Sequence, residues 1–413
     1  MRGTTFTAGQ VCARRTALAA LVVALVGCGS TVSGHETKPA GEPNLDGVSV
    51  GHLQTGNYPT TPVPPMTTSN SGPGVVLEGQ RMAGYVVDPS EVDATLTEVA
   101  GLSVFPLAGA TALGGLFGDT RTAVASAHGF VAGFSTARYS AGIRIQKSLL
   151  NVVMRFPDPP SAAAAVGEMN AADPYATGPL AQNPPPRHPT TIPRYPNAAA
   201  YETDDTTGNG ISVESFTAHG PYVLAQWIQT LGGLDAATAL AAKTLDLQGP
   251  RIDQFVPTDL SALPDLPIDP TGLFAHTLQA PKGMEGPFEG VYAPQGALHL
   301  EADPAAASAL FTAAGVDAVS LRGEAVYRAK DSAAAQQVVD GFAADWGAKS
   351  TPVDGVPGMP GARCLDRGAG LPIGEVRYVC FARADRYAFA VSSDQAEDAR
   401  QQTAAQYLVL ARS

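Results

Sequence analysis

Basic residues are scarce in this sequence. Its 413 residues include 26 Lys and Arg against 38 Asp and Glu, which gives a formal net charge of −12. A protein that binds nucleic acid through the phosphates needs a basic face or stripe, and no such cluster is present in the sequence. The same balance disfavours electrostatic attraction to anionic lipids. Nucleic acid is therefore not an expected partner, and any attachment to a membrane has to come from another source.

The sequence also lacks the spacings that identify catalytic and cofactor sites. There is no Gly-x-Ser-x-Gly elbow, and the nearest match, which begins at Gly210, has no second glycine. P-loop, dinucleotide, EF-hand and His-Glu-x-x-His spacings are absent as well. The seven histidines show no ligand spacing. We therefore expect a protein that is not an enzyme and holds no metal or cofactor.

No apolar run near the N-terminus is long enough for a membrane-spanning helix. Residues 17–26 form a run of about ten, against the roughly 20 that a span requires. Arg14 and Arg15 precede this run, and a basic region before a short apolar stretch is typical of an export signal. Residues 1–27 are therefore interpreted as a signal peptide. A second uncharged stretch, 99–118, contains Pro106 and five glycines, which favours a packed segment over a second span.

The sequence Leu25-Val26-Gly27-Cys28 resembles the lipobox of bacterial lipoproteins. The resemblance implies transfer of a diacylglyceryl group to the sulfur of Cys28, cleavage before it, and acylation of the new N-terminus. Two or three acyl chains give stable anchoring. We therefore expect the protein on the extracytoplasmic face of the plasma membrane, held there by lipid. Ordinary secretion with an incidental cysteine at this position is the alternative.

Cysteine is otherwise rare. Cys12 lies in the removed segment, and only Cys364 and Cys380 follow Cys28. An even pair in an oxidising compartment predicts a disulfide. Closing a loop of about 16 residues stabilises the fold by on the order of 3 kcal/mol in the chain-entropy model. A catalytic thiol with a spare neighbour is the alternative.

An internal repeat is the strongest architectural signal. The strand 151–156 precedes a helix that begins at Asp158-Pro159, and the strand 325–328 precedes one that begins at Asp331-Ser332. Two more strands and a closing helix then recur in each copy, at 211–217, 222–228 and 234–245 in the first and at 376–382, 387–393 and 394–410 in the second. This alignment places Cys364 opposite Ala200 and Cys380 opposite Ser215.

The repeat predicts an α+β fold of two tandem modules, each a mostly antiparallel sheet with helices on one face. The expected order is a signal peptide (1–27), a tether (28–47), a first repeat that includes an N-terminal arm (48–260) and a second repeat (261–413). The arm is expected to be extended, because the Thr-Pro pattern of 55–62 favours polyproline II.

Three blocks of the sequence, 55–62, 81–87 and 128–134, resemble a family of uncharacterised actinobacterial surface lipoproteins of mycobacterial and nocardial type. The likeness covers essentially the whole chain after the signal peptide. It implies a location at the cell surface and no catalytic residue.

His128 is the histidine of greatest interest, because it heads the third block and lies ahead of Arg138 and Tyr139. A histidine, an arginine and a tyrosine brought together are suited to an anionic or carbonyl-bearing ligand. The alternative, which we favour, is that this block packs near the sheet and that its glycines permit close approach.

These observations favour a non-enzymatic envelope module that binds a ligand or a partner protein, in a concave seam between the two copies. One alternative is an envelope hydrolase with a dispersed site around His128. The other is a structural partner of a membrane complex.

Overall fold

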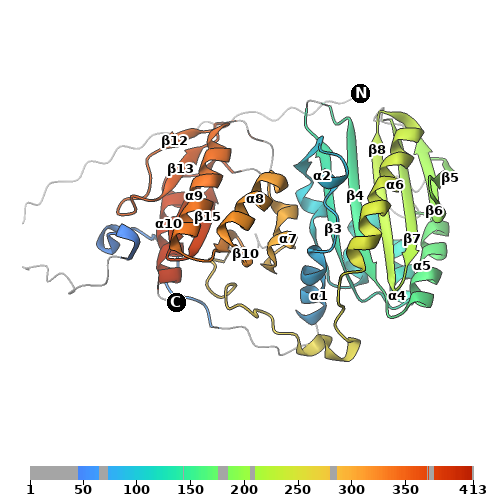
Figure 1. Ribbon diagram of the computed structural model, residues 1–413, viewed down its shortest axis with the longest axis horizontal. Coiled ribbons are helices and arrows are strands. Elements are labelled where there is room, and N and C mark those ends of the chain that lie inside the picture. Colours follow the sequence, from blue (N-terminus) through green and yellow to red (C-terminus); the bar gives the residue numbers. More distant parts are fainter. Residues whose placement is uncertain are drawn as a thin grey trace, which may run out of the picture. The chain divides into compact units, whose positions relative to one another are not determined.

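The protein folds into two antiparallel β-sheets, each with its own helices (Figure 1). The computed structural model describes residues 45–64, 73–142, 144–174, 185–204, 210–279, 286–369, 371 and 376–411. The α+β class with two tandem modules, predicted from the sequence, is confirmed. The predicted signal peptide, Cys28 and most of the predicted tether lie outside the described residues.

The first module contains the strand order β1-β3-β4-β8-β7-β6-β5, with β2 also paired to β3. Its strands are β1 (Leu96–Val99), β2 (Phe105–Leu107), β3 (Ala132–Ser140), β4 (Lys147–Arg155), β5 (Arg187–Ile192), β6 (Tyr195–Asp204), β7 (Ile211–His219) and β8 (Tyr222–Thr230). Its helices are α1 (Pro73–Ala83), α2 (Pro89–Val92), α3 (Gly114–Phe117), α4 (Asp119–Ala127), α5 (Pro159–Ala171) and α6 (Gly233–Ile252), with 3-10 turns η3 (Gly101–Ser103) and η4 (Ala110–Leu113).

The second module repeats this path as β9-β10-β11-β15-β14-β13-β12. Its strands are β9 (Gly290–Tyr292), β10 (Ala318–Arg322), β11 (Glu324–Arg328), β12 (Thr351–Val353), β13 (Arg363–Asp366), β14 (Tyr378–Ala384) and β15 (Tyr387–Ser393). Its helices are α7 (Pro294–Ala297), α8 (Pro304–Ala314), α9 (Ser332–Gly347) and α10 (Ala396–Ala411), with the 3-10 turn η6 (Leu298–Leu300). The turn η5 (Leu260–Asp265) lies between the modules in sequence.

Helices α5 and α9, which occupy equivalent positions in the two modules, begin where the sequence predicts. The Asp158 carboxylate accepts a hydrogen bond from the backbone N–H of Ser161 at 2.8 Å, and Asp331 accepts one from Ala334 at 2.8 Å. These N-caps satisfy a donor that a helix start otherwise leaves without a partner. The two equivalent caps, one in each module, mark the repeat.

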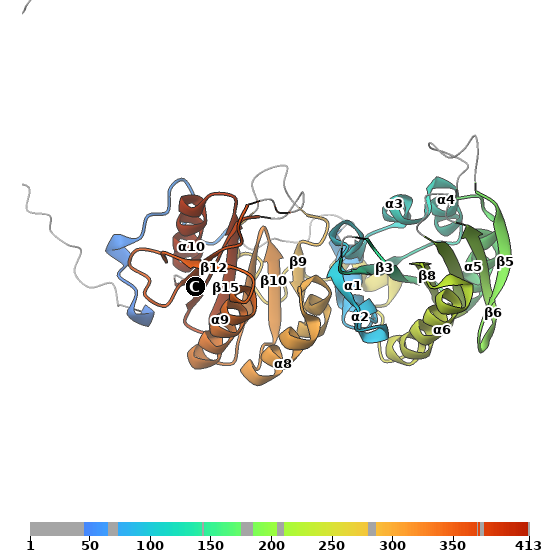
Figure 2. The same cartoon turned by 90° about the horizontal axis from the view of Figure 1, so that it is seen from above.

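The prediction of helices on one face of each sheet is wrong, because both faces are covered. Along β4, Val153 packs in the core beneath α6, whereas the next residue, Met154, packs in the core beneath α5. In the second module α9 and α10 likewise lie on opposite sides of the sheet (Figure 2). The physical reason is that β4 and β14 are apolar at successive positions, so neither face can be left in water.

The uncharged stretch 99–118 forms no long helix. It folds into η3, β2, η4 and α3. Strand β2 pairs with β3, and Leu113 and Phe117 pack on a face of the first sheet, in the core that also contains Phe216. Within the described ranges, no helix is both long and apolar enough to cross a membrane.

The N-terminal arm, defined here as residues 45–63, packs on the second module. It contains the turns η1 (Leu45–Gly47) and η2 (Val50–His52). Val48 lies in the same core as Tyr407 and Phe389 of the second module. The assignment of the arm to the first repeat is therefore wrong: its apolar side chains find their partners in the other copy.

Helix α1 belongs to the first module but also contacts α7 and β9 of the second. Gly296 of α7 makes this contact possible, because a Cβ there would lie 3.0 Å from the Cβ of Ala83 and 3.2 Å from the backbone nitrogen of Gly84. At this point the two modules therefore approach each other backbone to backbone.

Cys364 and Cys380 are joined by a disulfide between β13 and β14, where the two residues are direct partners across the strands. Ala200 and Ser215, which align with them in the first copy, are also direct cross-strand partners. The structure thus places both pairs as the sequence repeat predicts.

We expect the Cys364→Ala, Cys380→Ala double variant to lose on the order of 3 kcal/mol of unfolding free energy, because its unfolded chain is no longer cross-linked. Urea denaturation followed by circular dichroism measures the loss, and reduction of the wild-type protein should reproduce it. An unchanged midpoint in both cases would show that the bond contributes nothing to stability.

Candidate functional site

His128, Arg138 and Tyr139 are not brought together by the fold. His128 ends α4, where its Nε2 lies 3.0 Å from Glu168 Oε2. Strand β3 begins at Ala132, shortly after His128, and Arg138 lies six residues further along this strand, about 20 Å from Ala132 at the usual rise per residue. Tyr139 follows Arg138 directly and so points to the opposite face of the sheet. The ligand site predicted from these three residues is not formed.

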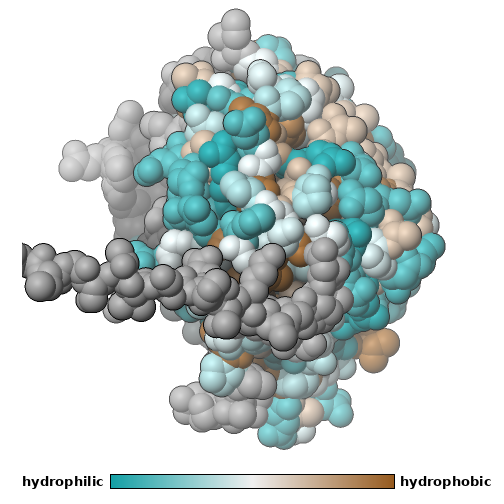
Figure 3. All heavy atoms as spheres, turned by 90° about the vertical axis from the view of Figure 1, so that its left-hand side faces the viewer, coloured by the Kyte–Doolittle hydropathy of each residue, from teal (hydrophilic) through white to brown (hydrophobic). Residues whose placement is uncertain are grey.

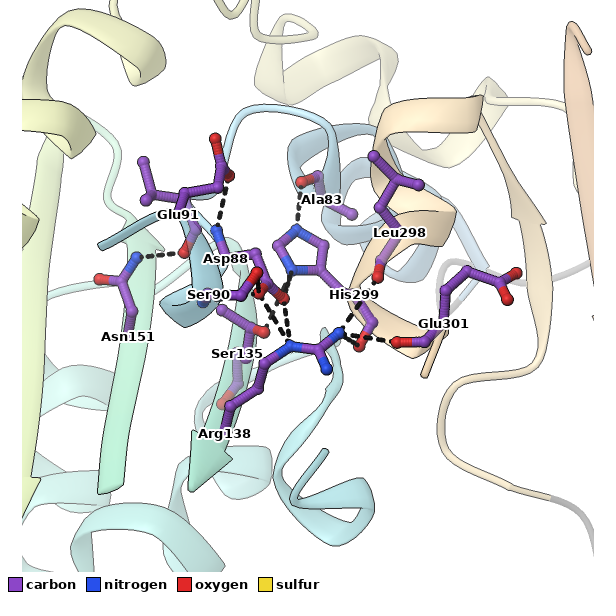
Figure 4. A network of polar contacts seen from close by, with 12 residues as sticks. Ala83, Asp88, Ser90, Glu91, Ser135, Arg138, Asn151, Leu298, His299 and Glu301 are labelled. Atoms are coloured by element: carbon purple, nitrogen blue, oxygen red, sulfur yellow. Dashed lines mark hydrogen bonds and ion pairs between the residues drawn. The ribbon is translucent and has the colours of Figure 1, made fainter. Parts of the chain in front are cut away.

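Arg138 instead lies at the centre of a buried polar network between the modules (Figure 4). Its Nε donates to both carboxylate oxygens of Asp88, at 2.8 and 3.0 Å. Its Nη1 donates to the backbone carbonyl of Thr97 at 2.9 Å. Asp88 is itself 3% exposed and Arg138 0%, so the ion pair is shielded from water.

The remaining nitrogen of the guanidinium, Nη2, contacts backbone carbonyls at a turn of the second module. Arg138 Nη2 lies 2.8 Å from the carbonyl oxygen of Glu301, 3.3 Å from that of Leu298 and 3.4 Å from that of His299. These carbonyls lie at the end of η6, where helical turns leave acceptors available; that of Leu298 also accepts from the backbone N–H of Glu301 at 3.2 Å. A side chain of the first module therefore caps a helical turn of the second.

His299 completes the network from the second module. Its Nε2–H donates to the carbonyl of Ala83 at 2.9 Å, while Nδ1 lies 3.1 Å from Thr136 Oγ1 and 3.2 Å from Asp88 Oδ2. The imidazole is 2% exposed and packs on the ring of Phe134 with centroids 5.0 Å apart. Both ring nitrogens are thus engaged inside the protein, which makes His299 a structural group.

The segment that carries Asp88 is itself held by buried amides. Gln248 accepts from the backbone N–H of Val87 at 2.8 Å and donates to the carbonyl of Tyr85 at 2.9 Å. Asn151 donates to the carbonyl of Val87 at 3.0 Å. Asp88 then begins α2 with a capping box, in which Glu91 accepts from the Asp88 N–H at 3.0 Å.

The network shifts the pKa values of two carboxyls in opposite directions. Burial alone would raise the pKa of Asp88, but the hydrogen bond and charge of His299 and the charge of Arg138 outweigh it and lower the pKa to about 2. Burial raises the pKa of Glu301 to about 7, against the opposing effects of the Tyr327 hydroxyl and Arg138. Asp88 is therefore ionised at neutral pH, whereas the pKa of Glu301 lies close to neutral pH.

A groove lies beside this network along α8, and we name it the α8 groove. It consists of two adjoining pockets of about 220 and 250 Å³ that share Gln295, Leu298 and Ser308. The first pocket is lined from both modules, by Val86, Asp88, Ser90 and Glu91 and by His299, Pro304 and Ala305. The second is lined by Pro294, Phe311, Thr312, Gly315 and Val316.

The charged residues of the α8 groove are already paired. Asp88 is bound by Arg138 and His299, and Glu91 accepts from both terminal nitrogens of Arg251, at 2.6 and 2.7 Å. The lining also includes Gln295 and Ser308, which are neutral hydrogen-bonding groups, and the apolar side chains of Leu298 and Phe311. In the part of the chain that the structure describes, no cluster of three or more His, Cys, Asp or Glu side chains is placed to hold a metal ion.

Sequence reasoning named Arg138 for a different purpose and missed Asp88 and His299 as its partners. The capping box from Asp88 to Glu91 is visible in the sequence, because Asp-Pro-x-Glu is a helix start. The pairing itself is not, since His299 lies 161 residues after Arg138 in the chain.

We expect the Glu301→Gln variant to be more stable than wild type above pH 7. The folded protein holds the Glu301 proton up to about pH 7, whereas the unfolded chain releases it near the ordinary pKa of 4.5, so wild-type stability falls as pH rises between these values. Glutamine should remove this part of the slope and gain on the order of 1–3 kcal/mol at pH 8. Urea titrations from pH 5 to 8 test this, with the exposed Glu397→Gln as control; parallel slopes for wild type and Glu301→Gln would contradict it.

Comparison with known proteins identifies a family. No curated protein matches the chain. Among solved structures, the extracellular domain of PknH from Mycobacterium tuberculosis is similar at 14% identity, with 44% of this chain and 96% of that chain covered and a TM-score of 0.28, too low to support an argument. Residues 65–268 match the N-terminal domain, and residues 273–413 the C-terminal domain, of the domain of unknown function DUF7373. Because these two matches together span most of the chain, the protein belongs to the DUF7373 family and consists of its N-terminal and C-terminal domains.

Proposed function

We propose that the protein is a lipid-anchored module of the cell envelope that binds a small neutral ligand, or a short neutral segment of a partner protein, in the α8 groove without catalysis. The observation that carries the proposal is the position of the groove. It lies at the seam of the two modules and takes lining residues from each.

The state of the ionisable groups favours binding over chemistry. Asp88 and His299 line the inner end of the groove, but each has its polar atoms engaged by other residues of the network. A general acid or base has to exchange a proton with its substrate, and a side chain fixed on both sides by the protein is poorly suited to that role. Gln295 and Ser308 offer neutral donors and acceptors instead.

The size of the groove limits its occupant. Pockets of about 220 and 250 Å³ are at or below the lower end of the range for drug-sized ligands, roughly 300–1,000 Å³. A compact ligand, or one or two side chains of a partner, matches these volumes. The absence of an unpaired charge in the lining favours a neutral occupant, since an ion would leave its solvation shell without a counter-charge.

The anchor rests on the sequence Leu25-Val26-Gly27-Cys28 and the export signal before it. We expect the mature protein from native membranes to begin at a diacylated Cys28, and the Cys28→Ala variant to leave the membrane fraction because it carries no lipid. Intact-mass analysis and membrane fractionation test this. An unlipidated wild-type N-terminus, or a variant that stays with the membrane, would remove the anchor from the proposal.

A substitution that fills the α8 groove tests binding. Ser308 lines both pockets, whereas its neighbour Ala309 is exposed and lines neither. We expect native mass spectrometry of the membrane-extracted protein to show a bound species on wild type and on the Ala309→Trp variant but not on Ser308→Trp, in which the indole occupies the site. A wild-type spectrum without any companion, or equal retention by both tryptophan variants, would refute binding at this groove.

A further inference from the structure

The N-terminal arm begins with polar contacts to the second module. The carboxylate of Asp46 accepts from the backbone N–H of Asp385 at 2.7 Å and forms an ion pair with Arg383. Arg383 also donates to Gln336 at 2.9 Å and to Ser332 Oγ at 2.7 Å, both on α9. One residue of the arm is thereby tied to the last hairpin of the sheet and to a helix that covers it.

The rest of the arm continues along the same module. The Ser49 N–H donates to the carbonyl of Gly358 at 2.8 Å, the Tyr58 hydroxyl to Asp398 at 2.7 Å, and the Val63 N–H to the carbonyl of Ala275 at 3.1 Å. Tyr58 also packs against the cluster of Leu278, Ala405 and Val409. The contacts are therefore spread over nearly the full length of the arm.

This arrangement makes the first module an insertion. The chain contributes residues 45–63 to the second module, then builds α1 to α6, and only afterwards builds β9 to β15. The arm also precedes both family matches, which begin at residues 65 and 273. Chain order alone would place the first module next to an N-terminal anchor, but the arm attaches that anchor to the second.

We propose that the docked arm makes the second module the membrane-proximal one and directs the first module away from the bilayer; this rests on the proposed lipid at Cys28. Sixteen residues separate Cys28 from Leu45, a reach of at most about 60 Å whatever their conformation. Any pull from the lipid is received at Asp46 and Ser49, on the second module.

The exposed surface of the second module agrees with a position beside hydrated headgroups. On the coloured part of the face seen in Figure 3, hydrophilic residues predominate, with smaller apolar areas among them. Such a face suits contact with the headgroup layer and not entry into the hydrocarbon core, where unpaired polar groups are costly.

The test uses the lipidated full-length protein in vesicles that contain a phospholipid with a photoreactive headgroup. After illumination, mass spectrometry maps the labelled peptides. We expect labelling of the second module (269–411) to exceed that of the first (73–258) by about threefold or more, given the short reach of the tether. Equal labelling, or an excess on the first module, would overturn the inference. Protein that fails to associate with vesicles would refute the lipid anchor instead, so the two failures are distinguishable.

A matched pair of glycine variants isolates the arm. Gly358 has φ +84° and a Cβ there would lie 2.8 Å from the Ser49 carbonyl and 3.0 Å from the Cβ of His52, whereas Gly368 has φ +87° and open space around it. Both alanine variants therefore carry the same backbone strain, and only Gly358→Ala meets the arm. We expect Gly358→Ala to lose the labelling bias and to speed hydrogen exchange at the Ser49 amide, with Gly368→Ala unchanged. Loss of protection at Ser49 with the bias intact would show that the arm does not set the orientation.

Discussion

The buried guanidinium of Arg138 is the interaction on which the arrangement of the two modules depends. Removing a cation from water costs several kcal/mol, and the cost is offset only when a counter-charge and an acceptor for each N–H are in place. The first module supplies the charge of Asp88 and the carbonyl of Thr97, and the second supplies carbonyls around η6. Neither module alone supplies all of these acceptors, so the side chain is fully satisfied only where the two modules meet. The contact between the modules is therefore built around buried polar groups as well as apolar ones.

The contacts between the modules also position residues of the α8 groove. Leu298 and His299, which form one wall, belong to the turn that Arg138 caps, and His299 is fixed a second time through Ala83. Side chains that are held before a ligand arrives lose little conformational freedom on binding, which favours affinity for a small occupant. The same network accounts for the charge state of the groove, because it lowers the pKa of Asp88, keeps the carboxylate ionised and pairs its charge with Arg138.

The elements that sequence reasoning predicted well are those set by local chemistry. Asp158 and Asp331 begin helices because an aspartate cap needs only its own next turn, and Cys364 and Cys380 pair because few other thiols exist. The errors concern choices made between distant segments. The order of the chain suggested that the arm belongs to the first module, but Val48 and Tyr58 pack against the second. Arg138 stood out as a ligand residue because the sequence does not show that Asp88 and the end of η6 surround it.

The two copies differ most in the lengths of the outer strands on one side of each sheet. Its outer strands β12 and β13 contain 3 and 4 residues, against 6 and 10 for β5 and β6 in the first copy. A short ladder provides few hydrogen bonds and few cross-strand pairs to hold an edge in register. The disulfide replaces an Ala200–Ser215 pair at this edge, and the arm adds apolar contacts to the core beneath it. The cross-link and the arm therefore add stabilising contacts where the strands of the second copy are shorter than those of the first. The arm that provides these contacts is also the part of the chain that leads to the proposed anchor, so one element serves both the stability of the second module and its proposed attachment.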